Sequence, residues 1–235
     1  MEAEKAVNLV VLTIHDFLFF ASQDYGAVAR PAGIIGSYSL MYAINREIPE
    51  VRRLVSGSTP HYDEDLPIMR VYSTPAAPTS DFPGQSSTKI SGHEGIRNNA
   101  SIGSKTRNWR QKEPMKLTWN SIGEELTFSM TRDRYNLPKT GAYYKHPPLS
   151  TYYFYLIGEP VPSLIRIGKK CTPARLRLSR LSVDYKSGKF EPTCPVTVVD
   201  LPSDTRILKG SLLTVPPAPV IIGAELDGEF PIHEA

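Results

Sequence analysis

The sequence has few of the residues that build metal centres, disulfide frameworks or long helices. Its only cysteines are Cys171 and Cys194, and neither belongs to a C-x-x-C motif or a Cys/His ligand pair. This excludes the usual patterns of a zinc site or a disulfide scaffold, and reduced thiols in a cytoplasm are the default. The chain has 2 tryptophans against 12 tyrosines, and its 21 prolines are about twice the average usage. This composition favours short strands joined by stiff loops over long helices.

Signals for secretion, membrane insertion and common catalytic machinery are also missing. The N-terminus, Met1-Glu2-Ala3-Glu4, has the wrong charge for a secretory signal. No apolar run approaches the roughly 20 residues that span a bilayer. We find no Walker loop, no Ser-His-Asp or Cys-His pairing and no cluster of metal-binding carboxylates. We therefore expect a soluble cytoplasmic protein that has no membrane partner, no cofactor and no metal ion.

What the sequence does have is a segregation of charge. Between Gln85 and Phe190 there are 19 Lys and Arg against 7 Asp and Glu, whereas the remainder has 8 against 17. The formal net charge of +3 therefore hides a basic middle between two acidic flanks. Because phosphate contacts dominate nucleic-acid affinity, the middle predicts contacts with RNA or DNA. The alternative is a basic face that only keeps the protein soluble.

The apolar pattern predicts an α+β fold that is mainly antiparallel sheet. Residues 7–14 are apolar on both alternating faces, which indicates a strand covered on both sides. Apolar residues at helical spacing predict a helix from about Ile34 to Ile48 that Pro49 stops. Residues 63–65 are interpreted as a solvated acidic loop, and residues 74–113 as a long loop without a period. Strands are expected at 68–73, 116–122, 125–131, 152–157, 174–183, 196–199, 211–215 and 220–222, with a hairpin turn near 123 and a bulge near 179–180.

Two basic segments are candidates for contact with RNA. In the first, Trp109 stands among Lys105, Arg107, Arg110 and Lys112. Cations bind phosphates and an aromatic ring can stack on an unpaired base. The alternative is a disordered surface tract whose tryptophan tucks back onto the fold.

The second segment surrounds Gly168 and Pro173. A glycine lets the backbone approach a phosphate closely, and flanking cations neutralise its charge. The competing interpretation is protection of a sheet edge against aggregation. The cations of this segment are Arg166, Lys169, Lys170, Arg175 and Arg177.

Two further clusters carry weaker signals. Residues 22–26, with Tyr25, lie together with Arg30, Gly33 and Gly36 ahead of the predicted helix, where free N–H groups could receive a phosphate. Ordinary loop closure explains these glycines equally well. Residues 143–146, Tyr-Tyr-Lys-His, contain the groups of a metal-independent ribonuclease, although a solvated histidine in a turn is the simpler interpretation.

Several segments taken together resemble one protein family. They are the helix IIGSYSLMYAI, the tract YDEDLPIMRVYSTPAAP, and YYFYLIG followed by IRIGKKCTPARLRLS and a proline-rich strand tail. They are similar to the Csc1 family, the Cas5-type subunits, within the RAMP superfamily, of type I-D CRISPR effector complexes (Cascade). The likeness runs over most of the chain. It implies an RRM-like, ferredoxin-like antiparallel core with one main helix, an inserted basic thumb and a β-rich C-terminal extension.

On this chain the resemblance implies three regions: 1–78 for the N-terminal part of the core, 79–148 for the thumb, and 149–235 for the remainder. It also implies a non-catalytic ribonucleoprotein subunit in antiviral defence. Such a subunit holds the 5′ handle of the crRNA and bridges the large subunit to the backbone subunits. Contact with target DNA near the PAM stays open. The expected RNA-binding residues are Arg166, Lys169, Lys170, Arg175, Arg177, Lys105, Arg107, Trp109, Arg110, Arg132, Arg134, Tyr25 and Arg30.

Two other functions remain open at this point. One is a metal-independent endoribonuclease that processes precursor crRNA through residues 143–146. The other is an interaction scaffold that never touches nucleic acid.

Overall fold

A computed structural model describes residues 6–20, 23–24, 28–52, 60–79, 115–120, 140–168 and 171–232. They form a sheet-rich α+β protein with short helices, as the composition predicts. The helices are α1 (Ser37–Ile44), α2 (Pro49–Arg52), α3 (Tyr62–Asp65) and the 3-10 turns η2 (Leu66–Ile68) and η4 (Val198–Asp200). The strands are β1 (Val7–Ile14), β2 (Gln23–Asp24), β3 (Val28–Arg30), β4 (Tyr72–Ser73), β5 (Ala77–Pro78), β6 (Met115–Asn120), β7 (Thr140–Lys145), β8 (Thr151–Ile157), β9 (Leu164–Ile167), β10 (Thr172–Leu181), β11 (Asp184–Phe190), β12 (Val196–Thr197), β13 (Arg206–Leu213) and β14 (Val220–Ile232). None of these helices has the length and apolar character needed to cross a membrane.

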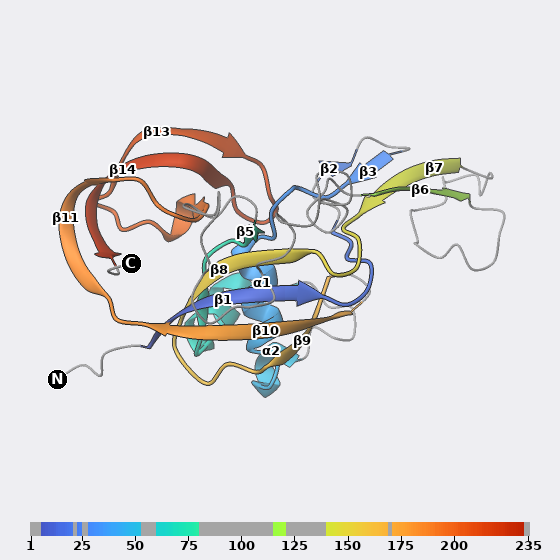
Figure 1. Cartoon of the computed structure of the whole chain (residues 1–235), viewed down its shortest axis with the longest axis horizontal. Coiled ribbons are helices and arrows are strands. Elements are labelled where there is room, and N and C mark those ends of the chain that lie inside the picture. The colour runs from blue at the N-terminus through green and yellow to red at the C-terminus, as the bar shows by residue number, and fades with distance from the viewer. Residues whose placement is uncertain are drawn as a thin grey trace, which may run out of the picture.

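The central sheet is built around β1. Its strand order is β4-β8-β1-β10-β9, and β5 also pairs with β8. Every pairing in this sheet is antiparallel. The register places Val11 between Arg177 of β10 and Tyr153 of β8. Figure 1 shows α1 crossing behind this sheet.

Both faces of β1 are covered, which confirms the interpretation of residues 7–14. Val10 and Leu12 are fully buried on one face, in a cluster that includes Leu40 and Ile44 of α1. Leu9 points to the other face, where residues 32–34 and 215–220 contribute to a second cluster. Burying one such aliphatic side chain contributes about 1.5–3 kcal/mol. The strand is therefore anchored from both sides.

The main helix ends earlier than predicted because Asn45 caps it. The Asn45 side-chain amide donates to the carbonyl oxygens of Met41 (2.8 Å) and Val71 (2.9 Å). Its Oδ1 accepts from the backbone N–H groups of Arg70 (3.0 Å) and Val71 (3.1 Å). These four bonds end α1 and hold the chain that leads into β4. The expected stop at Pro49 is wrong, since this proline begins α2.

The region between α2 and β4 also differs from the prediction. The acidic residues 63–65 lie in α3 rather than in a solvated loop. Asp65 is fully buried, and its Oδ2 accepts hydrogen bonds from the Tyr42 hydroxyl (2.8 Å) and the His61 N–H (3.2 Å). This buried polar group therefore has hydrogen-bond partners inside the fold, which offset the cost of its burial. The strand expected at 68–73 is reduced to its last two residues, in β4.

A second sheet forms at the C-terminal end of the chain. The long β14 pairs with β11 and β12 along one side and with β13 along the other. The strands expected at 196–199, 211–215 and 220–222 fall at β12 with η4, at the end of β13 and at the start of β14, whereas β11 was not predicted. This sheet is joined to the central one through Asp200, which accepts hydrogen bonds from the hydroxyls of Tyr38 (3.2 Å) and Tyr72 (3.0 Å).

A third sheet, β2-β3-β7-β6, extends from the central sheet at the end away from β11 and β13 (Figure 1). Its β6 pairs antiparallel with β7, so that Lys116 lies opposite Tyr144. The expected hairpin had residues 125–131 as the partner of this strand, and they lie outside the described residues.

The predicted bulge at residues 179–180 is wrong. β10 pairs with β1 in one uninterrupted register from Ala174 to Leu181. The apolar residues of β10 switch from even to odd positions because the first half of the strand is buried on one face and its end on the other. Leu176 packs in the cluster beneath α1, whereas Leu181 packs in the cluster on the opposite face.

Candidate nucleic-acid interface

Three described arginines lie on one face of the β9–β10 hairpin. Along β10, Ala174 and Leu176 are buried, while Arg175 and Arg177 point to the opposite face and are exposed. Arg166 of β9 is exposed too and lies opposite Pro173, two residues before Arg175 on the same face. We call Arg166, Arg175 and Arg177 the arginine face.

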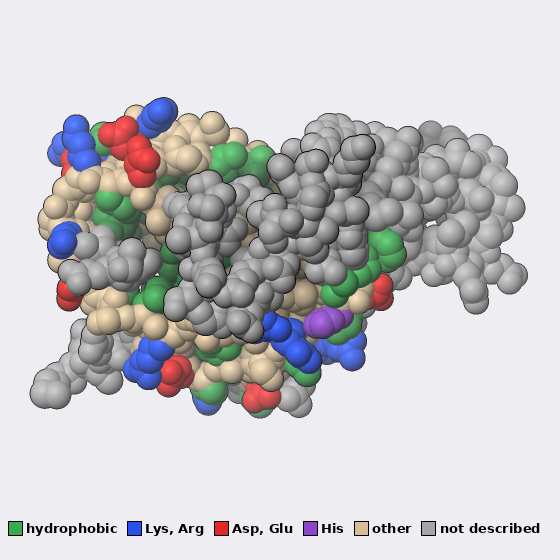
Figure 2. Space-filling view, in the orientation of Figure 1, with side chains coloured by type: hydrophobic (Ala, Val, Ile, Leu, Met, Phe, Trp, Pro, Cys, Tyr) green, Lys and Arg blue, Asp and Glu red, His purple; other side chains and the backbone are tan. Residues whose placement is uncertain are grey.

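The side of the central sheet that carries the arginine face is only partly covered. Over β1 and β8 that side is closed by residues 32–34 and 215–220. Over β9 and β10 the arginines reach solvent. Figure 2 shows Lys and Arg side chains gathered beside a histidine at the lower edge of the molecule, where Figure 1 places the ends of these two strands.

Carboxylates do not neutralise the arginine face within the described part of the chain. Arg166 donates one long hydrogen bond from Nη1 to the Cys171 carbonyl oxygen (3.4 Å). None of the three arginines forms an ion pair with a described carboxylate. Further along β10, Arg180 differs, because its Nη1 lies 3.8 Å from Oε1 of Glu159. Exposed cations without internal partners are available to a polyanion.

The glycine next to this face has an internal role. Gly168 has a φ of +76°, and a Cβ there would lie 2.6 Å from Cδ1 of Leu18 and 3.0 Å from the Phe19 carbonyl oxygen. The Cys171 N–H donates to the Gly168 carbonyl oxygen (3.0 Å). The glycine is therefore required by the turn and by packing, and its close approach to a phosphate stays a prediction.

Most of the other predicted RNA-binding residues lie outside the described residues. These are Lys169, Lys170, Lys105, Arg107, Trp109, Arg110, Arg132, Arg134 and Tyr25. For Arg30 the structure describes the backbone, which belongs to β3. Of the predicted residues whose side chains the structure describes, it brings together Arg166, Arg175 and Arg177 on one face.

The two glycines before α1 differ in their surroundings, because nothing lies within 4 Å of a Cβ on Gly33 whereas Gly36 is packed. A Cβ on Gly36 would lie 3.3 Å from Cγ1 of Val215. The first residue of the helix, Ser37, is buried, and its Oγ lies 2.9 Å from Oγ1 of Thr197. The C-terminal part of the chain therefore packs against the start of α1, and phosphate binding there stays a prediction.

His146 is buried, which corrects the interpretation of a solvated histidine in a turn. Its side chain is 1% exposed, and Nδ1 lies 2.7 Å from the Tyr152 hydroxyl oxygen. Its Nε2 has no hydrogen-bond partner among the described residues. Burial lowers the pKa of this imidazole from 6.5 to about 4, although the Ala32 backbone opposes the shift. A general base must reach its substrate, and this ring does not reach the surface.

Lys145 is a further cation near the arginine face that the sequence connected only with catalysis. Its Nζ lies 5.7 Å from the centre of the Phe17 ring, within the range of a cation–π contact. The Phe17 carbonyl oxygen accepts a hydrogen bond from the Thr172 hydroxyl at the start of β10 (2.8 Å). No local sequence signal links these residues, since they are brought together by the pairing of His146 with Leu18.

No group of three or more His, Cys, Asp or Glu side chains within the described ranges could hold a metal ion. The described part of the candidate site consists of exposed arginines at a sheet edge. Together, the fold and the site define a sheet-rich α+β protein with an exposed arginine face beside the strand pair β9–β10.

Comparison with known families identifies the class more closely. The sequence matches the type I-D CRISPR-associated protein Cas5/Csc1 family over residues 6–233, and the chain belongs to this family. It is therefore a subunit type of the type I-D CRISPR system, in keeping with a role in CRISPR defence beside other protein subunits. No curated protein matches the sequence.

Proposed function

We propose that this chain is a non-catalytic RNA-binding subunit of a type I-D CRISPR surveillance complex. It holds the 5′ handle of the crRNA and bridges the large subunit to the backbone subunits. The observation that carries the proposal is the arginine face, whose three exposed guanidinium groups have no carboxylate partner in the described part of the chain. Phosphates are the complementary ligand, and Arg is the side chain best suited to bind them in two-point contacts.

An RRM-like core is part of this proposal. Central β1 has antiparallel neighbours on both sides and α1 packs across one face, which supports such a fold. The middle of the opposite face is filled by residues 32–34 and 215–220. RNA would therefore follow the β9–β10 edge rather than stack on the sheet, in agreement with the lack of RNP motifs in the sequence.

The experiment is a double charge reversal. Arg175→Glu with Arg177→Glu should remove most of the crRNA that co-purifies with the complex, because two phosphate-binding cations become repulsive. The matched control is Lys186→Glu with Lys189→Glu, which changes the charge equally on exposed positions of β11. Unchanged RNA content in the first variant, or equal loss in both, contradicts the proposal.

The ribonuclease alternative receives no support from residues 143–146. Its histidine is buried against Tyr152, and protonation there is disfavoured at neutral pH. The direct test incubates the purified protein with repeat RNA in the absence of metal. Specific cuts that disappear in His146→Ala, but persist in an equally destabilised Tyr152→Phe variant, would establish the enzyme instead.

A further inference from the structure

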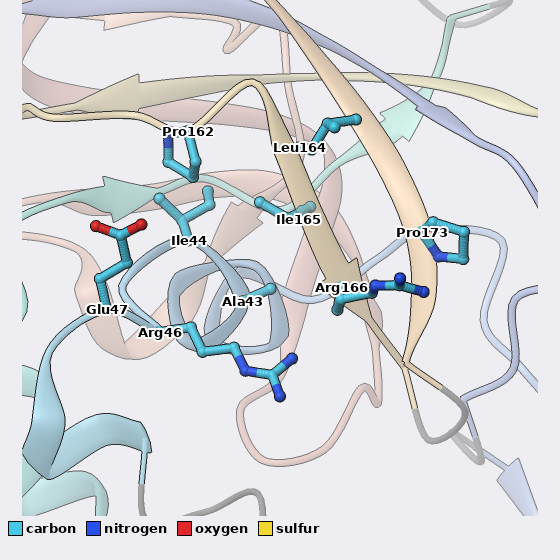
Figure 3. A pocket seen from close by; sticks show the side chains of 9 residues that line it. All are labelled: Ala43, Ile44, Arg46, Glu47, Pro162, Leu164, Ile165, Arg166 and Pro173. Carbon is cyan, nitrogen blue, oxygen red and sulfur yellow. The ribbon is translucent and has the colours of Figure 1, made fainter.

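A groove runs between the C-terminal end of α1 and the segment that leads into β9. One part has a volume of about 560 Å³, and its apolar lining comes from Ala43, Ile44, Pro162, Leu164 and Ile165 (Figure 3). A second part of about 280 Å³ continues past Ile48, Pro49, Pro160 and Val161. Ile44, Glu47 and Pro162 line both parts, so the two parts adjoin.

The floor of this groove is aliphatic. Ile44 and Ile165 are buried at its base, whereas Leu164 is 60% exposed along its wall. No aromatic side chain is found among the described residues that line either part. Unpaired bases are usually held by stacking on aromatic rings. A floor of Ile, Leu, Val and Pro instead fits the aliphatic side chains of a protein segment.

The rim of the groove carries an excess of positive charge. Among the described residues that line the groove, Arg46 and Arg166 lie along the first part and Arg70 along the second, against one carboxylate, Glu47. Figure 3 shows the guanidinium groups of Arg46 and Arg166 toward the same side, with Glu47 at the other end. An occupant that is complementary to this rim has acidic side chains beside its apolar ones.

We propose that the groove docks a segment of another subunit of the complex, in which aliphatic residues are flanked by Asp or Glu. The proposal rests on the bridging part of the proposed function and gives it a location. Arg166 belongs both to the groove and to the arginine face. The protein contact and the RNA contact therefore meet at β9, with apolar burial on one side and phosphate binding on the other.

The occupant can be identified by photocrosslinking. A benzophenone amino acid replaces Glu47, which is exposed and lines both parts of the groove, in a complex assembled from all co-expressed subunits and crRNA. We expect a crosslink to one segment of another subunit that has an acidic residue within a few positions of an aliphatic one. A crosslink to an RNA nucleotide, a crosslink to a segment without acids, or no crosslink to protein from the assembled complex overturns the proposal.

A charge swap tests the rim independently. Arg46→Glu with Arg70→Glu should lower the affinity for the crosslinked subunit about tenfold, the order of effect expected for rim charge pairs. Replacing the acids of the mapped segment by Lys should restore binding, which a merely unfolded variant cannot do. The matched control is Arg206→Glu with Lys209→Glu on β13. Lack of rescue, or equal loss in the control, contradicts the proposal.

The experiments distinguish a failure of the groove proposal from a failure of the proposed RNA-binding function. The groove variants leave Arg175 and Arg177 in place and should retain crRNA binding by the chain itself. The arginine-face variants should lose RNA and keep the crosslink from position 47 in subunits assembled without RNA. Loss of RNA in the groove variants would show that the groove binds nucleic acid and not protein.

Discussion

Nδ1 of His146 lies 2.7 Å from the hydroxyl oxygen of Tyr152, and both side chains are buried. The two rings meet edge to face with their centres 5.6 Å apart. His146 follows the last residue of β7, and its backbone N–H and carbonyl form hydrogen bonds of 2.9 and 3.0 Å with the backbone of Leu18. This pair therefore fixes the β2-β3-β7-β6 sheet to the central sheet.

Removing the hydroxyl in Tyr152→Phe should lower the free energy of unfolding by about 1–3 kcal/mol, because a buried imidazole nitrogen loses its partner. Urea unfolding measures the change. Tyr185→Phe is the control, since Tyr185 is 68% exposed and should change the stability by less than about 0.5 kcal/mol. Equal effects of the two substitutions would show that the His146 contact has no energetic role.

The same histidine makes the fold sensitive to acid. Burial lowers the pKa of His146 from 6.5 to about 4, so below pH 6.5 the unfolded chain binds a proton that the folded chain does not. The stability present above pH 6.5 is lost as the pH falls toward 4, by up to about 3 kcal/mol. Unfolding curves at several pH values should show this loss, and it should be smaller in His146→Gln. An identical pH dependence in both proteins would exclude His146 as its source.

Gly168 should be intolerant of any side chain. In Gly168→Ala the positive φ costs about 1–2 kcal/mol, and the contact of the new Cβ with Leu18 and Phe19 adds about 1–3 kcal/mol. Gly223→Ala separates the cost of the positive φ from the cost of the contact, because its φ is +58° and nothing lies within 4 Å of the added Cβ. Thermal unfolding of both variants gives the comparison. A similar loss in both would mean that the turn conformation alone requires glycine.

The arginine face should determine the salt dependence of RNA binding. Arg175→Ala with Arg177→Ala removes two phosphate contacts, so the slope of log K against log salt should become less steep by about 1.4. Fluorescence anisotropy with a labelled single-stranded handle RNA, measured over a range of salt concentrations, gives the slope. Lys186→Ala with Lys189→Ala should leave it unchanged. A slope that does not differ from that of the unmodified protein would place the phosphates elsewhere.

Several elements were predictable because their signal is local. The two apolar faces of residues 7–14 required cover on both sides, and β1 has it. The β-prone run at 152–157 forms β8, and the alternation of Arg175, Leu176 and Arg177 places the arginines on one face of β10. The family was also readable from dispersed segments, and the match over residues 6–233 confirms it.

Other features could not be read because they depend on partners far away in the chain. Asn45 ends α1 through bonds to Arg70 and Val71, so helical periodicity up to Ile48 was misleading. The switch of apolar residues from even to odd positions in β10 was interpreted as a bulge. The strand is regular there, and the switch arises because different faces of it are covered at its two ends. The environment of His146 follows from its pairing with Leu18 and Tyr152, which no spacing reveals.

The sequence by itself determined the kind of protein: a β-rich α+β chain with a basic middle, because alternation, composition and charge are properties of neighbouring residues. Only the tertiary structure decided which groups meet. The β9–β10 pairing sets Arg166 opposite Pro173, on the same face as Arg175. The packing of α1 against the segment before β9 creates a groove with arginines on its rim. Such juxtapositions arise from the burial of apolar surface between segments that are distant in the chain, and local pattern does not encode them.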